Sequence, residues 1–217
     1  MYEKGYNNAM RVFVAFEIEK DNLKPILEKL NEYKEAIIDF RWTFNENLHI
    51  TLCFFRDLDD IGINILKNAI NDSIQNIEPI GFNTDHIITL PTGFWRNKDY
   101  GYVSTITPYK GIALNINKGK KEIKTLYENI ENNLIKYGKE ENYMLRPKEK
   151  REFIPHITLG RKKWKESVFH KFNFSEYYII EGLLNKLIIY QSELDEKNKN
   201  RMHKLFPKYT KLYEYQI

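Results

Sequence analysis

Two short segments far apart in the chain carry the same chemical groups. The tetrapeptide His-Ile-Thr-Leu stands at residues 49–52 and again at residues 156–159. In an extended strand the side chains alternate between faces, so each copy presents its histidine and threonine on one side and its isoleucine and leucine on the other. A match to His-x-Thr-Leu is expected by chance on the order of 0.02 times in a chain of this composition. The repetition therefore indicates a shared function for the two segments.

The paired motifs contain the groups that can cleave a phosphate ester without a metal. Near neutral pH one imidazole can take a proton from water while the other donates a proton to the leaving oxygen. We predict that His49 and His156 are this catalytic pair. The hydroxyls of Thr51 and Thr158 are predicted to bind the substrate, because they can donate hydrogen bonds to its non-bridging oxygens.

Other reactive side chains have simpler explanations. A single histidine on a strand is more often structural than catalytic, and His86, His170 and His203 have no repeated context, so we interpret them as structural. Cys53 could act as a nucleophile if it shared the face of His49, which requires a regular strand. Free cysteine more often fills small spaces in the core, and we favour that interpretation. We also expect the aromatic side chains near the first motif to pack in the core rather than stack on a nucleobase; they are Trp42, Phe54 and Phe55.

Three charged segments allow both a structural and a functional interpretation. The acidic cluster of Asp57, Asp59 and Asp60 precedes a predicted helix, which favours N-terminal capping over metal binding. The Lys/Glu-rich loop at residues 138–152 is interpreted as a solvated surface. Residues 161–165 interleave cations with a tryptophan directly after the second motif, which favours contact with RNA over a solvated strand end.

The pattern of apolar residues predicts similar surroundings for the two motifs. The order is strand, helix, strand with the motif, helix and strand, followed again by strand, helix and strand with the motif, which indicates a duplicated unit packed as one body. Helices are predicted from Leu23 to Ile37 with Pro25 in the first turn, from Ile63 to Ile77, and from Ile116 to Leu134 with an end at Gly138. Strands are predicted at residues 12–18, which should be central, and at residues 44–55, 82–90, 100–107, 153–161, 176–191 and 211–217.

Composition narrows the class of protein only broadly. The 217 residues are 42% hydrophobic, which predicts a folded core, and the formal charge of +4 leans toward polyanionic partners. Cys53 is the only cysteine, so an internal disulfide is excluded and a reducing cytoplasm is expected. The polar first ten residues and the short apolar run after them lack the layout of a secretory signal or a membrane span, so no membrane contact is expected.

Three segments resemble the two-histidine phosphoesterase superfamily, and specifically its LigT-like RNA 2',3'-cyclic phosphodiesterases, historically called 2'-5' RNA ligases. They are FNENLHITL, FIPHITLGR and RVFVAFEI, within a resemblance that spans about residues 10 to 195. The resemblance implies an α+β fold that is bilobal, duplicated and pseudo-twofold symmetric, with two antiparallel-type sheets facing a central cleft and helices on the outside. It implies a single domain of two packed lobes over residues 10–217, after an N-terminal extension at residues 1–9.

The resemblance also implies an activity, which is the opening of a terminal 2',3'-cyclic phosphate of RNA to a 2'-phosphate with no metal and no other cofactor. His49 would protonate the departing 3' oxygen, and His156 would activate water. Arg161 matches the family's HxTLxR extension, which implies that it binds substrate. Residues 91–105 depart from the family's usual Gly-Phe-Pro element, so substrate contacts there do not carry over.

Several partners and functions remain open from the sequence. The substrate is expected to be RNA with a 2',3'-cyclic phosphate end, tRNA fragments included, or a nucleotide, and the protein is expected to act as a monomer. One alternative keeps the same chemistry on a small cyclic nucleotide or an ADP-ribose cyclic phosphate. Another is 2'-5' RNA ligation or RNA binding with little hydrolysis.

Overall fold

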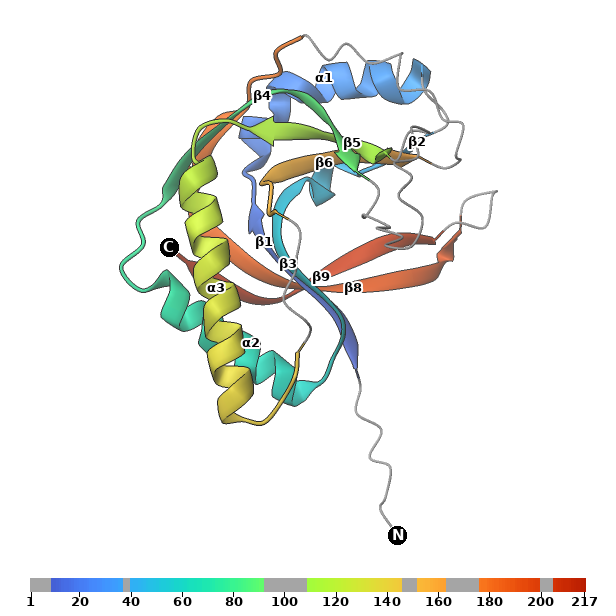
Figure 1. Ribbon diagram of the computed structural model, residues 1–217. Helices are drawn as coiled ribbons and strands as arrows, with labels where there is room; N and C mark the ends of the chain where they lie inside the picture. The colour runs from blue at the N-terminus through green and yellow to red at the C-terminus, as the bar shows by residue number, and fades with distance from the viewer. Residues whose placement is uncertain (1–8, 37–39, 92–108, 146–151, 163–175, 200–204) are drawn as a thin grey trace, which may run out of the picture.

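The computed structural model describes residues 9–36, 40–91, 109–145, 152–162, 176–199 and 205–217 (Figure 1). The helices of this part of the chain are α1 (Lys20–Ala36), α2 (Asp60–Ile74) and α3 (Lys120–Glu140), with a short 3-10 helix at Asn45–Asn47. The strands are β1 (Met10–Glu17), β2 (Phe40–Trp42), β3 (His49–Leu58), β4 (Ile80–Pro91), β5 (Tyr109–Ile116), β6 (His156–Lys162), β7 (Glu181–Leu184), β8 (Lys186–Lys199) and β9 (Leu205–Gln216).

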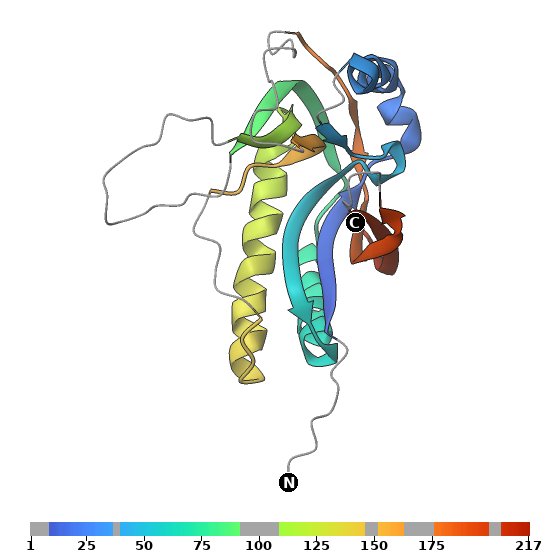
Figure 2. The ribbon, with the colours of Figure 1, turned by 90° about the vertical axis from the view of Figure 1, so that its right-hand side faces the viewer.

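The strands of the described residues form one curled, nine-stranded antiparallel sheet (Figures 1 and 2). Their order is β7-β4-β5-β6-β3-β1-β8-β9, and β2 pairs with β6 outside this path. The two halves of the sheet meet between β3 and β6 through a single pair of facing residues, Ile50 and Ile157. The expected α+β fold is therefore confirmed, with two antiparallel halves that join in the middle.

The order of elements repeats around the two motifs. β1, α1 and β3 form the first unit, β5, α3 and β6 form the second, and each motif begins the last strand of its unit. Within each unit the two strands are hydrogen-bonded neighbours. Because Ile50 and Ile157 are the second residues of the two motifs and pair antiparallel, an approximate twofold axis passes between them.

The strand predicted to be central is central. β1 lies between β3 and β8, and its residues Val12 to Phe16 are all buried. A strand that is covered on both faces needs apolar side chains at consecutive positions, which is the pattern of this segment.

The helices lie on the outside of the curled sheet, in two places. α2 and α3 pack against each other (Figure 1), where the Asn133 amide donates to the Ser73 hydroxyl at 2.9 Å. α1 lies at the other end of the molecule, where the hydroxyls of Tyr33 and Tyr178 are 2.6 Å apart. One continuous core cluster contains buried residues from both halves of the sheet and from all three helices.

The third helix differs from its prediction at both ends. Ile116, expected in the helix, is the last residue of β5, because the chain reverses at Gly119 with a φ of 78° before α3 begins. The helix continues through Gly138 to Glu140, and Asn142, with a φ of 50°, is the residue in the left-handed region that follows it. Gly138 instead allows a close approach, since a Cβ there would meet the carbonyl oxygen of Tyr143 at 2.7 Å.

The first helix begins earlier than predicted, so Pro25 lies inside α1, after its first turn. The second helix begins as predicted with a cap, because the Asp59 carboxylate accepts a hydrogen bond from the amide of Gly62 at 2.9 Å. The capping interpretation of the acidic cluster is therefore confirmed for Asp59. No helix of the described residues is long and apolar enough to cross a membrane.

Several predicted segments lie wholly or partly outside the described residues. They are the extension at residues 1–9, the strand at residues 100–107, most of the divergent segment at residues 91–105, part of the charged loop at residues 138–152, and most of the basic stretch at residues 161–165. The strand that pairs with β6 is β5, which was not predicted, because a strand was expected at residues 100–107 and Ile116 was assigned to the helix that follows. A Cβ at Gly111 would lie 2.3 Å from the carbonyl oxygen of Gly160, so the glycine permits this strand pairing.

Candidate active site

The two motifs present their polar side chains on the same face of the sheet. Ile50 and Ile157 face each other across β3 and β6, so the residues on either side of them point to the opposite face. This places His49, Thr51, His156 and Thr158 together, each partly exposed, on what we call the site face. The buried isoleucines lie on the other face, in the core.

A β-bulge follows each motif and redirects the next side chain. In β6 the pairing with β5 skips Leu159, and in β3 the pairing with β1 skips Leu52. Both strands then show the same order of burial over six residues: partly exposed, buried, partly exposed, buried, buried and exposed. The bulge returns Arg161 to the site face, where strict alternation would have buried it with Leu159.

His49 is held by hydrogen bonds at both ring nitrogens. Its Nδ1 lies 2.7 Å from the backbone oxygen of Asn47, and its Nε2 lies 2.9 Å from the hydroxyl of Thr51. A carbonyl oxygen only accepts, so Nδ1 carries the proton and the neutral ring receives a hydrogen bond from Thr51 at Nε2.

His156 repeats the first of these contacts. Its Nδ1 donates to the backbone oxygen of Ile154 at 2.7 Å, again the carbonyl two residues before the histidine. Its Nε2 makes no hydrogen bond with the residues that the structure describes. Both imidazoles are thus fixed in the same tautomer, and the Nε2 of His156 is available to accept a proton.

The surroundings favour the neutral form of both histidines. Burial lowers the pKa of His49 to about 4, and the positive charges of His156 and Arg161 lower it further, against the opposing effect of the hydrogen bond to Asn47. The pKa of His156 is lowered by burial first and by the charge of Arg161 second. An anion between the two rings would reverse this effect by favouring the protonated forms.

An aromatic wall surrounds His49. The ring of Phe13 in β1 stacks on His49 at a centroid distance of 5.0 Å, and Tyr209 in β9 meets it edge-on at 5.7 Å. Tyr190 in β8 lies 6.4 Å away. A pocket is lined by His49, Tyr190 and Tyr209 and also by Glu17, whose carboxylate is held by the Lys211 ammonium at 2.8 Å.

The charges of three arginines lower the pKa of one tyrosine hydroxyl at the site. Burial raises the pKa of Tyr209, and the charges of Arg161, Arg11 and Arg41 oppose that rise. Arg41 faces Arg161 across β2 and β6. The pKa of Arg161 is lowered mainly by burial and secondly by the charge of Arg41. Like charges placed opposite one another destabilise a sheet, so this arrangement favours a bound anion.

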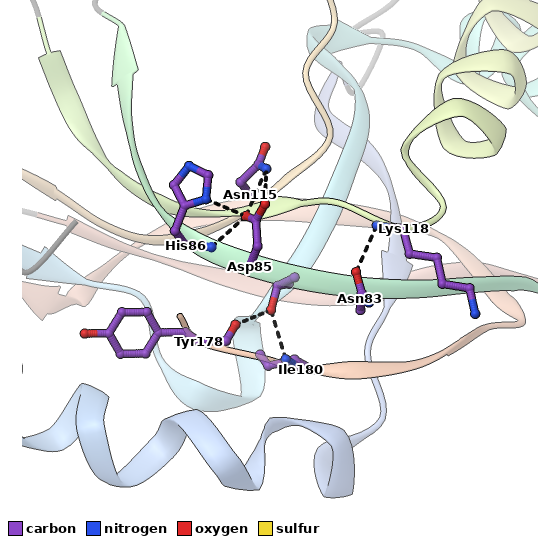
Figure 3. A network of polar contacts seen from close by, with 8 residues as sticks. Asn83, Asp85, His86, Asn115, Lys118, Tyr178 and Ile180 are labelled. Carbon is purple, nitrogen blue, oxygen red and sulfur yellow. Dashed lines mark hydrogen bonds and ion pairs between the residues drawn. The ribbon is translucent and has the colours of Figure 1, made fainter. Parts of the chain in front are cut away.

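A polar network beside His156 was not found from the sequence. Asn115 in β5 is the cross-strand neighbour of His156, and its amide nitrogen donates to both carboxylate oxygens of Asp85, at 3.0 and 3.2 Å (Figure 3). The same carboxylate holds the ring nitrogen Nδ1 of His86 at 2.9 Å. The side-chain oxygen of Asn115 accepts no hydrogen bond from the described residues. Only knowledge of the β5–β6 register could have linked these residues to the motif.

The remaining predictions divide as follows. Cys53 is buried and its thiol donates to Glu131 at 3.5 Å, so the core interpretation is confirmed. Phe55 is buried and Trp42 packs against the core, as predicted. The prediction that Phe54 packs in the core is wrong, because the bulge turns Phe54 to the site face, where its side chain is 39% exposed. His170 and His203 lie outside the described residues.

Known proteins resemble this chain in sequence and in fold. A family model described as LigT-like phosphoesterase matches residues 16–94. An RNA 2',3'-cyclic phosphodiesterase of Thermotoga maritima is 23% identical over 209 residues, which cover 96% of each chain. Another, of Methanocaldococcus jannaschii, is 29% identical over 155 residues, which cover 71% of this chain and 73% of the relative.

The fold has a counterpart among solved structures. The crystal structure of E. coli LigT complexed with 3'-AMP superposes with a TM-score of 0.63 and 16% identity, over 97% of this chain and 99% of LigT. At that identity the superposition establishes the shared fold. The family model, the relatives aligned along most of the chain and the common fold together make this chain similar to the LigT-like phosphoesterases.

Proposed function

We propose that the protein hydrolyses the 2',3'-cyclic phosphate end of RNA to a 2'-phosphate by acid/base catalysis between His49 and His156, without a metal. The observation that carries the proposal is the pair of identically oriented imidazoles on one face of the sheet, each fixed by the carbonyl two residues before it. The relatives named RNA 2',3'-cyclic phosphodiesterase support the same substrate class.

The geometry suggests a role for each histidine. His156 takes a proton from water through its free Nε2 as the water oxygen attacks phosphorus. The bond between phosphorus and the 3' oxygen breaks, and His49 gives its Nε2 proton to that oxygen. The products are a 2'-phosphate and a 3' hydroxyl, and the two rings exchange their proton states with solvent before the next turnover.

Substrate binding prepares His49 for this role. With a pKa of about 4 in the empty site, His49 is mostly neutral at pH 7. The negative charge of the phosphate favours the imidazolium and so raises the pKa of His49 on binding. Thr51, Thr158 and Arg161 provide hydrogen bonds and positive charge to the non-bridging oxygens, where charge is concentrated in the transition state.

Asn115 adds a group that the sequence analysis did not include. Its amide nitrogen is held by Asp85, so its side-chain oxygen keeps a fixed orientation beside His156. That oxygen can accept a hydrogen bond from the attacking water and so align it with phosphorus.

The test is hydrolysis of a short RNA ending in a 2',3'-cyclic phosphate by the full chain in EDTA. We expect a 2'-phosphate product, and we expect His49→Ala and His156→Ala each to lower kcat by a factor on the order of 1000. Cys53→Ser is the matched control, because Cys53 lies in the same strand as His49 but on the core side.

Two outcomes would contradict the proposal. One is the absence of turnover of the cyclic end by the folded wild-type chain. The other is activity that survives loss of either histidine while EDTA abolishes it, since that would assign the chemistry to a metal. Turnover of free cyclic nucleotides but not of RNA would retain the mechanism and change the substrate.

A further inference from the structure

An aromatic ring with a cation above it lies on the site face, beyond the first motif. Phe54 in β3 is 39% exposed, and the guanidinium carbon of Arg11 in β1 lies 5.2 Å from the centre of its ring. Phe54 is the cross-strand neighbour of Phe13, the ring that stacks on His49. The exposed ring is therefore continuous with the wall around the candidate acid.

The duplicated units place Phe54 and Arg161 at equivalent positions. Each motif is followed by a bulge, and in each strand the next exposed residue returns to the site face. In β6 that residue is the cation Arg161, and in β3 it is the aromatic Phe54. The two sides of the site therefore differ in chemistry although their backbones correspond.

Positive charge extends from one side of the site to the other. Arg161 and Arg41 are cross-strand neighbours in β6 and β2, and Arg11 lies over the ring of Phe54 in β3. The charges of all three arginines oppose the rise in the pKa of Tyr209. Cations on the site face together with an exposed aromatic ring match a single-stranded nucleic acid, in which a charged backbone carries flat bases.

An isolated exposed apolar residue needs no functional explanation. Phe54 differs because its ring has a cation above it and shares the face and the strand of His49 and Thr51. It lies about 10 Å along the strand from Thr51 at the usual rise per residue. The phosphate held by Thr51 therefore does not reach Phe54, whereas the base of a neighbouring nucleotide does.

We propose that Phe54, with Arg11, forms a stacking site for the base of the nucleotide before the terminal one, so that the enzyme prefers an RNA strand to a mononucleotide. This inference rests on the proposed function, because it adds a binding site to that reaction. Stacking of one base on an aromatic ring contributes a factor of roughly 5 to 150 in affinity.

The test compares kcat/KM on 2',3'-cyclic AMP with kcat/KM on a trinucleotide ending in the same cyclic nucleotide. Phe54→Ala should lower kcat/KM for the trinucleotide by roughly 5- to 100-fold and leave that for 2',3'-cyclic AMP within about twofold. Phe54→Tyr, which keeps the ring, should behave like the wild type. A trinucleotide that lacks the penultimate base should be a poorer substrate for the wild type and equally poor for Phe54→Ala.

Tyr213 provides the matched control. It is also 39% exposed and has a cation above its ring, with the Lys67 ammonium nitrogen at 4.3 Å, but it faces Ile189 across β8 and β9 and so lies on the other face of the sheet. Tyr213→Ala should alter neither substrate.

Three results would overturn the inference: an equal loss on both substrates, no loss on either, or a loss on the trinucleotide that persists when the penultimate base is absent. If the wild type turned over neither substrate, the proposed function itself would fail. The two proposals therefore fail by different observations.

Discussion

At the scale of single residues, the backbone determines which ring nitrogen of each histidine carries the proton. The carbonyls of Asn47 and Ile154 each accept from an Nδ1, so both rings direct Nε2 away from their own strand backbone. Burial lowers the pKa of each ring, and both rings are therefore neutral near pH 7. In the proposed mechanism, such a pair becomes charged only when an anion enters, and this would tie proton transfer to substrate binding.

The lowered pKa of His49 predicts a stability that depends on pH. An unfolded chain protonates His49 near pH 6.5 but the folded chain only near pH 4, so its contribution is complete above 6.5 and is lost as pH falls toward 4. Between pH 7 and pH 5 the wild type should lose about 2 kcal/mol more of its unfolding free energy than His49→Gln. Urea unfolding at the two pH values checks this, and equal losses in the two proteins would contradict it.

The hydrogen bonds of Asn115 predict a role in positioning the reaction. Asn115→Ala, or Asp85→Asn, should lower kcat on the order of tenfold to a hundredfold with little change in KM, and should change the pH dependence of kcat. Asn83→Ala is the control. Asn83 lies in β4, like Asp85, and its side-chain oxygen accepts a hydrogen bond from the amide of Lys118 at 2.9 Å (Figure 3). A loss of kcat in Asn83→Ala as large as that in Asn115→Ala would indicate a general effect on the strand.

The sequence predicts the residues of the two motifs but not the residues that surround them in the site. His49, Thr51 and their equivalents are repeated, and a repeat is visible in one sequence. Asn115 carries no signal of its own, because its importance comes from facing His156 across two strands. Phe54 was assigned to the core, since strict alternation of side chains cannot anticipate a bulge.

At the scale of elements, the two bulges determine what the site contains. They turn β3 and β6 away from each other after one pair of facing residues and bring Phe54 and Arg161 back to the site face. A bulge bends its strand and increases the local twist, which also curls the sheet. The glycines beside the bulge in β6 allow its backbone to lie close to that of β5.

Gly111 provides a test of this close packing. Gly111→Ala would place a Cβ 2.3 Å from the carbonyl oxygen of Gly160, so it should lower the unfolding free energy by about 2 kcal/mol or more and displace Arg161. Gly81→Ala is the control, since the nearest atoms to its Cβ belong to the flexible side chain of Lys118 at 3.6 Å. Thermal unfolding of both variants measures the difference, and equal melting temperatures would contradict the packing.

The cap of α2 gives a second test at this scale. Asp59 accepts from the amide of Gly62 and, at 2.7 Å, from the hydroxyl of Tyr143, so it both begins the helix and ties it to the segment after α3. Asp59→Ala should cost about 1 kcal/mol of stability or somewhat more. Asp57→Ala, at an exposed position in the same acidic cluster, should cost little by comparison in the same urea titration. Equal costs would contradict the assignment of the cap.

At the scale of the whole molecule, duplication explains why one strand pair organises the site. The last strands of the units β1-α1-β3 and β5-α3-β6 pair with each other only at Ile50 and Ile157, and the approximate twofold axis between these residues relates the two histidines. The three helices and the two strands with the motifs were predictable from periodicity, because each records its own burial, whereas β5 was not predicted. The pairing of β3 with β6 was not, since no local pattern specifies which distant strand will be its neighbour.

The central claim is that both histidines flank one phosphorus centre, and an NMR titration tests it most directly. The ring protons of His49 and His156, assigned with His49→Gln and His156→Gln, would be followed against pH with and without inorganic phosphate. We expect one equivalent of bound phosphate to raise the pKa of both rings, that of His49 from about 4, with a single dissociation constant. A phosphate that shifts only one ring, or shifts the two with different dissociation constants, would contradict the claim.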